Sequence, residues 1–119
     1  MKIAFLHYHL KTGGVTTVIR QQIAAIRNDC DTIAIAGETP PEFPVNITAV
    51  PGVAYSHKNA PSSSPEVTAS QIIDSIKKQW PEGCDILHVH NPLLAKNKTF
   101  LQVLKILQAE GITLFLQIH

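Results

Sequence analysis

Long apolar runs alternate along this chain with segments of helical spacing, and this alternation constrains the fold more than any other feature. The runs are too continuous for strands that leave one face in water, and they are typical of parallel strands covered by helices on both faces. A shorter run at 46–50, NITAV, is a weaker candidate strand. The four strong candidates are KIAFLHYH at 2–9, TIAIAG at 32–37, DILHVH at 85–90 and ITLFLQIH at 112–119.

Between these runs, apolar residues recur at the three- and four-residue spacing of a helix. The second of these segments follows SSSPE, where Ser63 or Ser64 can cap the helix and Pro65 suits its first turn. The third ends before Gly111, a residue type favoured just beyond a helix C-terminus. The periodic positions are Val15, Val18, Ile19, Ile23 and Ile26, then Ala69, Ile72, Ile73 and Ile76, then Phe100, Leu101, Leu104 and Leu107.

This order of elements predicts an α/β fold, an open parallel, doubly wound, Rossmann-like sheet flanked by helices. The 119 residues suit a single domain, 1–119. In such a sheet the first strand lies beside the strand that opens the second half. We therefore expect the run at 2–9 to neighbour the run at 85–90, with the run at 112–119 next to that.

The segment 37–65 departs from the alternation, because it holds six of the eight prolines and a run of three serines. It predicts an irregular excursion. A segment of this length in a compact domain is usually functional, but a mobile surface loop explains it equally well.

Composition excludes several classes of partner. The chain is 45% hydrophobic with a formal net charge of +1, so no basic field indicates a nucleic acid. No apolar run approaches the roughly 20 residues of a membrane span, although peripheral membrane contact stays open. Cys30 and Cys84 have neither metal-ligand spacing nor a disulfide framework around them, and we interpret them as reduced thiols of a cytoplasmic protein.

Five of the six histidines fall near the carboxyl ends of three predicted strands. Because side chains alternate along a strand, each pair on one strand points to one face. With the expected strand order, all five converge on the crevice where doubly wound folds bind ligands. They are His7 and His9, His88 and His90, and His119.

The histidines have both structural and functional interpretations. His7 and His88 lie deeper in their strands, and we favour a partly buried imidazole bonded to backbone. His9, His90 and His119 are outermost, which favours ligand contact. A metal site is a rival interpretation, since imidazole is a common ligand. Against it, the chain has no H-x-x-x-H motif and no carboxylate at these strand ends.

A second candidate site is HLKTGGV at 9–15, between the first strand and the first helix. Gly13 and Gly14 leave backbone N–H groups accessible at a helix N-terminus, where they suit a phosphate, and Lys11 could add a charge. A tight turn without a ligand is the alternative. The spacing matches neither the dinucleotide fingerprint nor the P-loop.

The third is HNP at 90–92. Pro92 disfavours helical geometry at Asn91 and is itself suited to start a helix. Asn91 could bond a ligand hydroxyl, but we expect it to cap that helix.

Taken together, MKIAFLHYHLKTGGVTTVI, DILHVHNP and the terminal LFLQIH resemble the N-terminal domain of group-one glycosyltransferases. These are retaining enzymes of the GT-B architecture that use a nucleotide sugar. The resemblance covers both ends and the centre of the chain, but not 37–65. It implies one half of a GT-B architecture, an acceptor-side fragment of a longer two-domain protein that is inactive alone.

The resemblance also implies roles for single residues. His119 resembles the histidine that contacts the transferred sugar, the assignment we take as catalytic. Gly13 and Gly14 resemble the loop near the donor diphosphate, and His9, Lys11, His90 and Asn91 are expected along the cleft on the acceptor side. It implies no cofactor and no metal, only a nucleotide-sugar donor as co-substrate and an acceptor that is not specified. A stand-alone α/β ligand-binding module, a histidine-based metal-binding domain and an interaction half-domain stay open.

Overall fold

The computed structural model describes residues 1–56, 64–93 and 96–119, and it confirms the predicted fold class. Five parallel strands form one sheet in the order β3-β2-β1-β4-β5, as expected for the runs that the sequence places beside one another. The elements are β1 (Lys2–His9), α1 (Gly14–Ile26), β2 (Asp31–Glu38), β3 (Ile47–Ala49), the 3-10 helix η1 (Pro51–Val53), α2 (Pro65–Gln79), β4 (Ile86–His90), α3 (Phe100–Ala109) and β5 (Leu114–Gln117).

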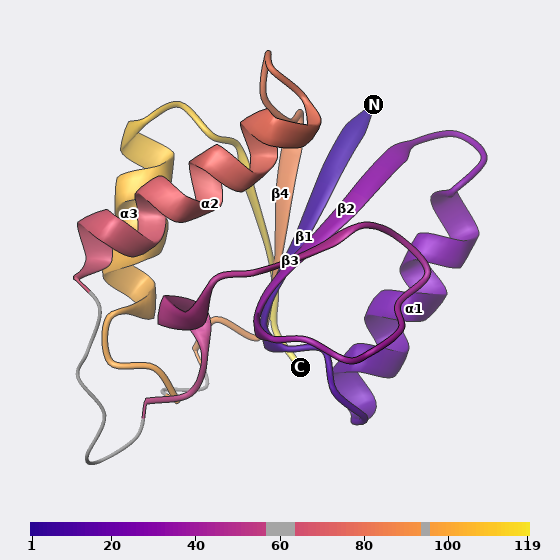
Figure 1. Cartoon of the computed structure of the whole chain (residues 1–119), viewed down its shortest axis with the longest axis horizontal. Coiled ribbons are helices and arrows are strands. Elements are labelled where there is room, and N and C mark those ends of the chain that lie inside the picture. The colour runs from indigo at the N-terminus through magenta and orange to yellow at the C-terminus, as the bar shows by residue number, and fades with distance from the viewer. Residues whose placement is uncertain (57–63, 94–95) are drawn as a thin grey trace.

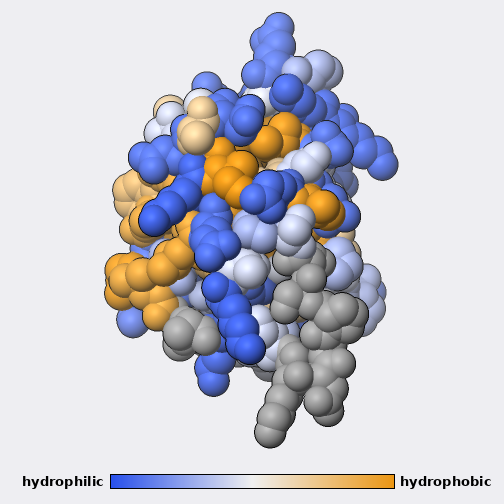
Figure 2. Space-filling view, turned by 90° about the vertical axis from the view of Figure 1, so that its left-hand side faces the viewer, coloured by the Kyte–Doolittle hydropathy of each residue, from blue (hydrophilic) through white to orange (hydrophobic). Residues whose placement is uncertain are grey.

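The helices divide unequally between the two faces of the sheet (Figure 1). On β1, Leu6 and Tyr8 face α2 and α3, whereas Phe5 faces α1, because successive side chains alternate between faces. The face under α2 and α3 buries the larger apolar cluster. The outer surface over these two helices is mainly hydrophilic with separate apolar patches (Figure 2).

The start of α2 follows the predicted capping pattern. The Ser64 hydroxyl oxygen accepts a hydrogen bond from the Val67 N–H at 3.1 Å, and Pro65 occupies the first turn. Glu66 lies in the first turn and Lys77 and Lys78 in the last, where their charges complement the helix dipole. Ser63 lies outside the described residues.

Within the excursion at 37–65, β3 confirms the weaker candidate strand at 46–50, and η1, which was not predicted, follows it. Gly37 approaches Ala54 so closely that a Cβ on Gly37 would overlap the Ala54 backbone. The Asn97 amide donates hydrogen bonds to the carbonyl oxygens of Gly52 and Ala54, which fixes this segment against the turn before α3.

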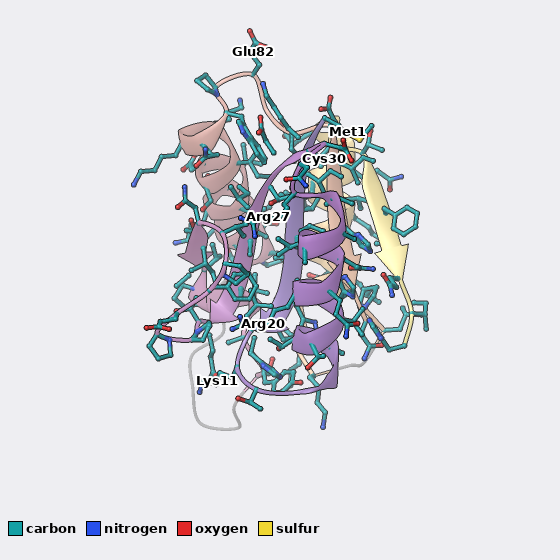
Figure 3. The ribbon with its side chains drawn as sticks, turned by 90° about the vertical axis from the view of Figure 1, so that its right-hand side faces the viewer. Met1, Lys11, Arg20, Arg27, Cys30 and Glu82 are labelled. Atoms are coloured by element: carbon teal, nitrogen blue, oxygen red, sulfur yellow. The ribbon has the colours of Figure 1, made fainter. Side chains whose placement is uncertain are left out.

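The prediction that helices cover both faces is wrong for β5. This strand spans only Leu114–Gln117, and Phe115 and Leu116 are 55% and 49% exposed. Two features explain the difference: β5 is the edge strand of the sheet, and α1 lies beside it rather than over it (Figure 3).

Candidate functional site

The candidate site lies where the sheet changes its direction of winding. β1 is bonded to β2 on one side and to β4 on the other, so the chain winds outward from β1 in one direction and then, from β4, in the other. Doubly wound sheets bind ligands beyond the carboxyl ends of the strands at this switch point. The end of β5 and the start of α1 lie at the same end of the sheet (Figure 1).

The structure brings His90 and His119 together at this edge. Nδ1 of His90 lies 2.8 Å from Nε2 of His119. The imidazole at the end of β4 therefore shares a hydrogen bond with the imidazole two residues beyond the end of β5. Their ring centroids are 5.1 Å apart, too far for close face-to-face contact. His90 is fully buried and His119 is exposed. His119 is therefore the more accessible of the two rings.

Two glutamines complete a polar cluster around His90. Nε2 of His90 lies 2.8 Å from Oε1 of Gln22 on α1, and the Gln22 amide nitrogen donates to Oε1 of Gln117 on β5 at 2.8 Å. Nε2 of His88 lies 2.9 Å from the same Gln117 oxygen. Both ring nitrogens of His90 thus have partners within the protein, so His90 supports His119 rather than lining an open cleft.

His7 agrees with the interpretation as a buried imidazole bonded to backbone, whereas His88 bonds the Gln117 side chain instead. Nδ1–H of His7 donates to the His90 carbonyl oxygen at 3.2 Å, and the His88 ring stacks on the His90 ring at a centroid distance of 4.5 Å. Burial lowers the pKa of His7 to about 4 and that of His90 to about 3, and it also lowers the pKa of His88. Mutual repulsion between protonated imidazoles adds to the low His90 pKa.

His9 stands apart from the His90–His119 pair. Its ring packs edge-on against Tyr55, with centroids 5.5 Å apart, and it points toward the backbone at Gly13. Nδ1 of His9 is buried and has no hydrogen-bond partner among the described residues. An unpaired buried nitrogen is costly, so His9 is the least satisfied of the described histidines.

The start of α1 is open, as the two glycines suggest. Gly13 is the N-cap and provides no side-chain cap, and the first turn has no acidic residue. A Cβ on Gly14 would meet nothing within 4 Å, and a Cβ on Gly13 would make only ordinary contacts. Packing within the described chain therefore does not require glycine at either position.

Lys11 is not a free cation beside this helix start. Its ammonium group lies 2.9 Å from Oε2 of Glu38, and both side chains are largely exposed. The predicted strand ended at residue 37, which left Glu38 beyond it. In the structure Glu38 is the last residue of β2. A bound phosphate would have to compete with this carboxylate for Lys11.

The predicted capping role of Asn91 is wrong. A turn follows β4 at Pro92, and the next helix among the described residues, α3, begins at Phe100 with Thr99 as its N-cap. Asn91 instead has φ 52°, a left-handed conformation that asparagine tolerates better than most residues. The Tyr8 hydroxyl is within hydrogen-bonding distance of the carbonyl oxygens of Asn91 and Pro92, at 3.3 and 3.2 Å.

Gln22 and Gln117 were not identified from the sequence. Gln117 stands two positions before His119, so the same alternation that grouped the histidines places it on their face. Gln22 precedes the buried Ile23, at the border of the apolar stripe of α1. A search for polar residues at such borders would have found it.

A separate groove of about 410 Å³ lies on the other side of α1, lined in part by Arg20, Arg27 and Cys30 (Figure 3). Arg20 already donates to the Glu42 carbonyl oxygen at 3.2 Å and stacks over Phe43. None of the five described histidines lines this groove, so it is distinct from the candidate site.

Within the described ranges, no group of three or more His, Cys, Asp and Glu side chains is arranged to hold a metal ion. Cys30 and Cys84 are free. Among the helices described, none has the length and apolarity needed to cross a bilayer. No protein-family model matches the chain, and no curated protein matches it either.

Proposed function

We propose that this chain is the N-terminal, acceptor-side domain of a retaining, nucleotide-sugar-dependent glycosyltransferase of the GT-B architecture. One observation carries the proposal: an exposed imidazole, His119, is held by a buried one, His90, at the switch point of the sheet. The sequence resemblance assigns the sugar-contacting role to this same His119. The uncapped start of α1 at Gly13 and Gly14 supports a phosphate-bearing ligand at the same end of the sheet.

In this proposal the residues divide the work of sugar transfer. Departure of a nucleoside diphosphate needs stabilisation of negative charge, which the N–H groups around Gly14 would provide. His119 would contact the transferred sugar, while His9 and Asn91 would line the acceptor side of the cleft. His90 would act through His119. Lys11 would contribute only after exchange of its Glu38 partner.

The nucleotide itself would be bound by a second α/β domain of the same protein. Nothing in the candidate site offers a pair of carboxylates, so two-acid hydrolysis of a glycoside is not favoured. We therefore expect the domain alone to be inactive and the two-domain protein to be the enzyme. The co-substrate would be a nucleotide sugar, without a further cofactor.

The test measures release of nucleoside diphosphate by the full-length protein from a panel of nucleotide sugars. Replacing His119→Ala should lower the rate by about 10²-fold or more, the usual scale for a group that acts at the reacting centre. His57→Ala is the matched control for loss of one imidazole, since His57 is the histidine that falls outside the predicted strands in the sequence.

The other outcomes separate the alternatives. Release that is unaffected by His119→Ala would remove the catalytic assignment and leave the enzyme class. Saturable binding of a nucleotide sugar without turnover, with acceptors supplied, would favour a ligand-binding module. Retention of stoichiometric zinc through gel filtration would favour a metal-binding domain.

A further inference from the structure

Four hydrogen bonds join five side chains into one continuous line across the sheet face under α1. In spatial order the side chains are His119, His90, Gln22, Gln117 and His88, and the successive distances are 2.8, 2.8, 2.8 and 2.9 Å. The line crosses from beyond β5 to β4, then to α1, and returns to β5 and β4. Each hydrogen bond needs one donor and one acceptor. A neutral imidazole has one of each, so the choice of donor at one hydrogen bond fixes the donor at the next.

Only two neutral arrangements satisfy every link. In the first, each of the three histidines is protonated at Nε2: His119 donates to His90, and His90 donates to Gln22. Gln22 and His88 then both donate to the Gln117 oxygen. In the second, both amides are turned over and every donor becomes an acceptor, so the three histidines are protonated at Nδ1. No mixed arrangement keeps all four hydrogen bonds.

The first arrangement is the favoured one. Neutral histidine in water prefers the Nε2–H tautomer, and the first arrangement places all three rings in that form. The second requires the less stable tautomer three times. Because the links are coupled, the preference of each ring adds to that of the others.

We infer that Gln22 and Gln117 are positioning residues that, through His90, hold neutral His119 in the Nε2–H tautomer and leave its Nδ1 as a hydrogen-bond acceptor. Nδ1 of His119 has no hydrogen-bond partner in the part of the chain described here. An acceptor nitrogen binds the hydroxyl of a ligand, whereas it repels the oxygen atoms of a phosphate or a carboxylate.

This assignment deepens the proposed function and rests on it, because a sugar hydroxyl is the ligand group that the tautomer selects. Burial lowers the pKa of His90 to about 3, so His90 stays neutral near neutral pH and keeps its Nδ1 lone pair toward His119.

The first measurement needs no substrate and no variant. Long-range ¹⁵N–¹H correlation spectra of the labelled protein, at a pH where the rings are neutral, distinguish a protonated ring nitrogen from one with a lone pair. We expect His88, His90 and His119 all to show protonated Nε2 and unprotonated Nδ1. A protonated Nδ1 on neutral His119, or an even mixture of its tautomers, would overturn the inference.

Two substitutions at Gln22 test the coupling. Gln22→Leu removes the acceptor of His90 Nε2–H, and we expect His119 to lose its single tautomer. Gln22→Glu keeps that acceptor but removes the donor to Gln117. The Gln117 amide should then turn over and donate to both neighbours, which converts His88 from Nε2–H to Nδ1–H while His119 stays unchanged.

Gln21→Leu is the matched control, because Gln21 is the neighbouring exposed glutamine of α1; it should leave all three rings as in the wild type. An unchanged His88 tautomer in Gln22→Glu would contradict the inference even if Gln22→Leu failed to fold. Failure of this proposal and of the proposed function remain distinct. A different tautomer of His119 refutes the inference about Gln22 and Gln117. The expected tautomer without any nucleotide-sugar binding refutes the proposed glycosyltransferase function.

Discussion

His90 and His119 lie 29 residues apart in the chain, yet Nδ1 of the first is 2.8 Å from Nε2 of the second. The parallel register of β4 and β5 brings them together, because His90 pairs with Gln117 and the chain continues two residues further to His119. The buried His90 ring is fixed by its partners, whereas the exposed His119 ring is accessible to a ligand.

The first prediction concerns stability below neutral pH. Burial lowers the pKa of His90 to about 3 and of His7 to about 4, against 6.5 for an ordinary histidine. The unfolded chain therefore binds protons that the folded protein does not. Above pH 6.5 both rings are neutral in the folded and the unfolded state, so neither lowers the unfolding free energy there. Between pH 6.5 and 4, each ring should cost up to about 1.4 kcal/mol of unfolding free energy per pH unit.

Urea denaturation at several pH values measures this slope. His90→Gln should make it shallower by up to about 1.4 kcal/mol per pH unit, since one of the two buried imidazoles is lost. An identical slope in the variant and the wild type would show that His90 does not resist protonation in the folded state.

The second prediction contrasts two glycines. A Cβ on Gly37 would overlap the Ala54 backbone, whereas a Cβ on Gly14 would project into open space. Gly37→Ala should destabilise the protein by more than about 2 kcal/mol, because β2 and η1 would have to separate. Gly14→Ala should change the unfolding free energy by less than about 0.5 kcal/mol. Thermal unfolding of the pair checks both values.

Gly14→Ala also bears on the proposed ligand. If a diphosphate approaches the backbone here, the added methyl group should weaken nucleotide-sugar binding by the full-length protein without loss of stability. Unaltered affinity, measured by calorimetry, would place the phosphates elsewhere.

A third prediction concerns Tyr8. Its buried hydroxyl is within hydrogen-bonding distance of the carbonyl oxygens of Asn91 and Pro92, and so supports the left-handed turn after β4. Tyr8→Phe should lower the unfolding free energy by about 1–2 kcal/mol, because a buried carbonyl oxygen loses a donor. Amide hydrogen exchange should accelerate at Asn91 and Leu93. Asn91→Gly should be tolerated, whereas Asn91→Val should be destabilising at this positive φ.

The exposed edge strand leads to a fourth prediction. Phe115, Leu116 and Ile118 are each about half exposed or more, and β5 is an edge strand of the sheet that the described residues form. Apolar side chains beside unpaired backbone groups favour association. The isolated domain should therefore self-associate as its concentration rises, as followed by sedimentation velocity. Phe115→Thr should weaken this association more than Leu101→Thr, a comparably exposed apolar residue on α3.

The sequence was sufficient to predict the parallel sheet and its strand order. The apolar runs that contain His7 and His88 are long, and segments with clear helical spacing separate them. It was also sufficient to group His90 with His119, since alternation and strand order fix which side chains share a face. Alternation alone does not reveal how far a helix extends across a sheet. For that reason the exposure of Phe115 was missed.

The prediction that a helix starts at Pro92 was wrong for a related reason. Pro92 has the same local preference at a helix start and in a turn, and the tertiary contact from Tyr8 decides between them. Gln22 belongs to a helix far from β4 in the chain, so no local pattern links its amide to His90.

The central position of β1 has a consequence for synthesis on the ribosome. β1 is made first, but its second neighbour is β4, and the bond from His7 to the His90 carbonyl oxygen joins residues 83 positions apart. At the usual 5–20 residues per second, β1 waits roughly 4–17 s for that partner. During translation the backbone groups along one edge of this apolar strand are unpaired. We therefore expect the nascent chain to need protection from association at this stage, before its site has formed.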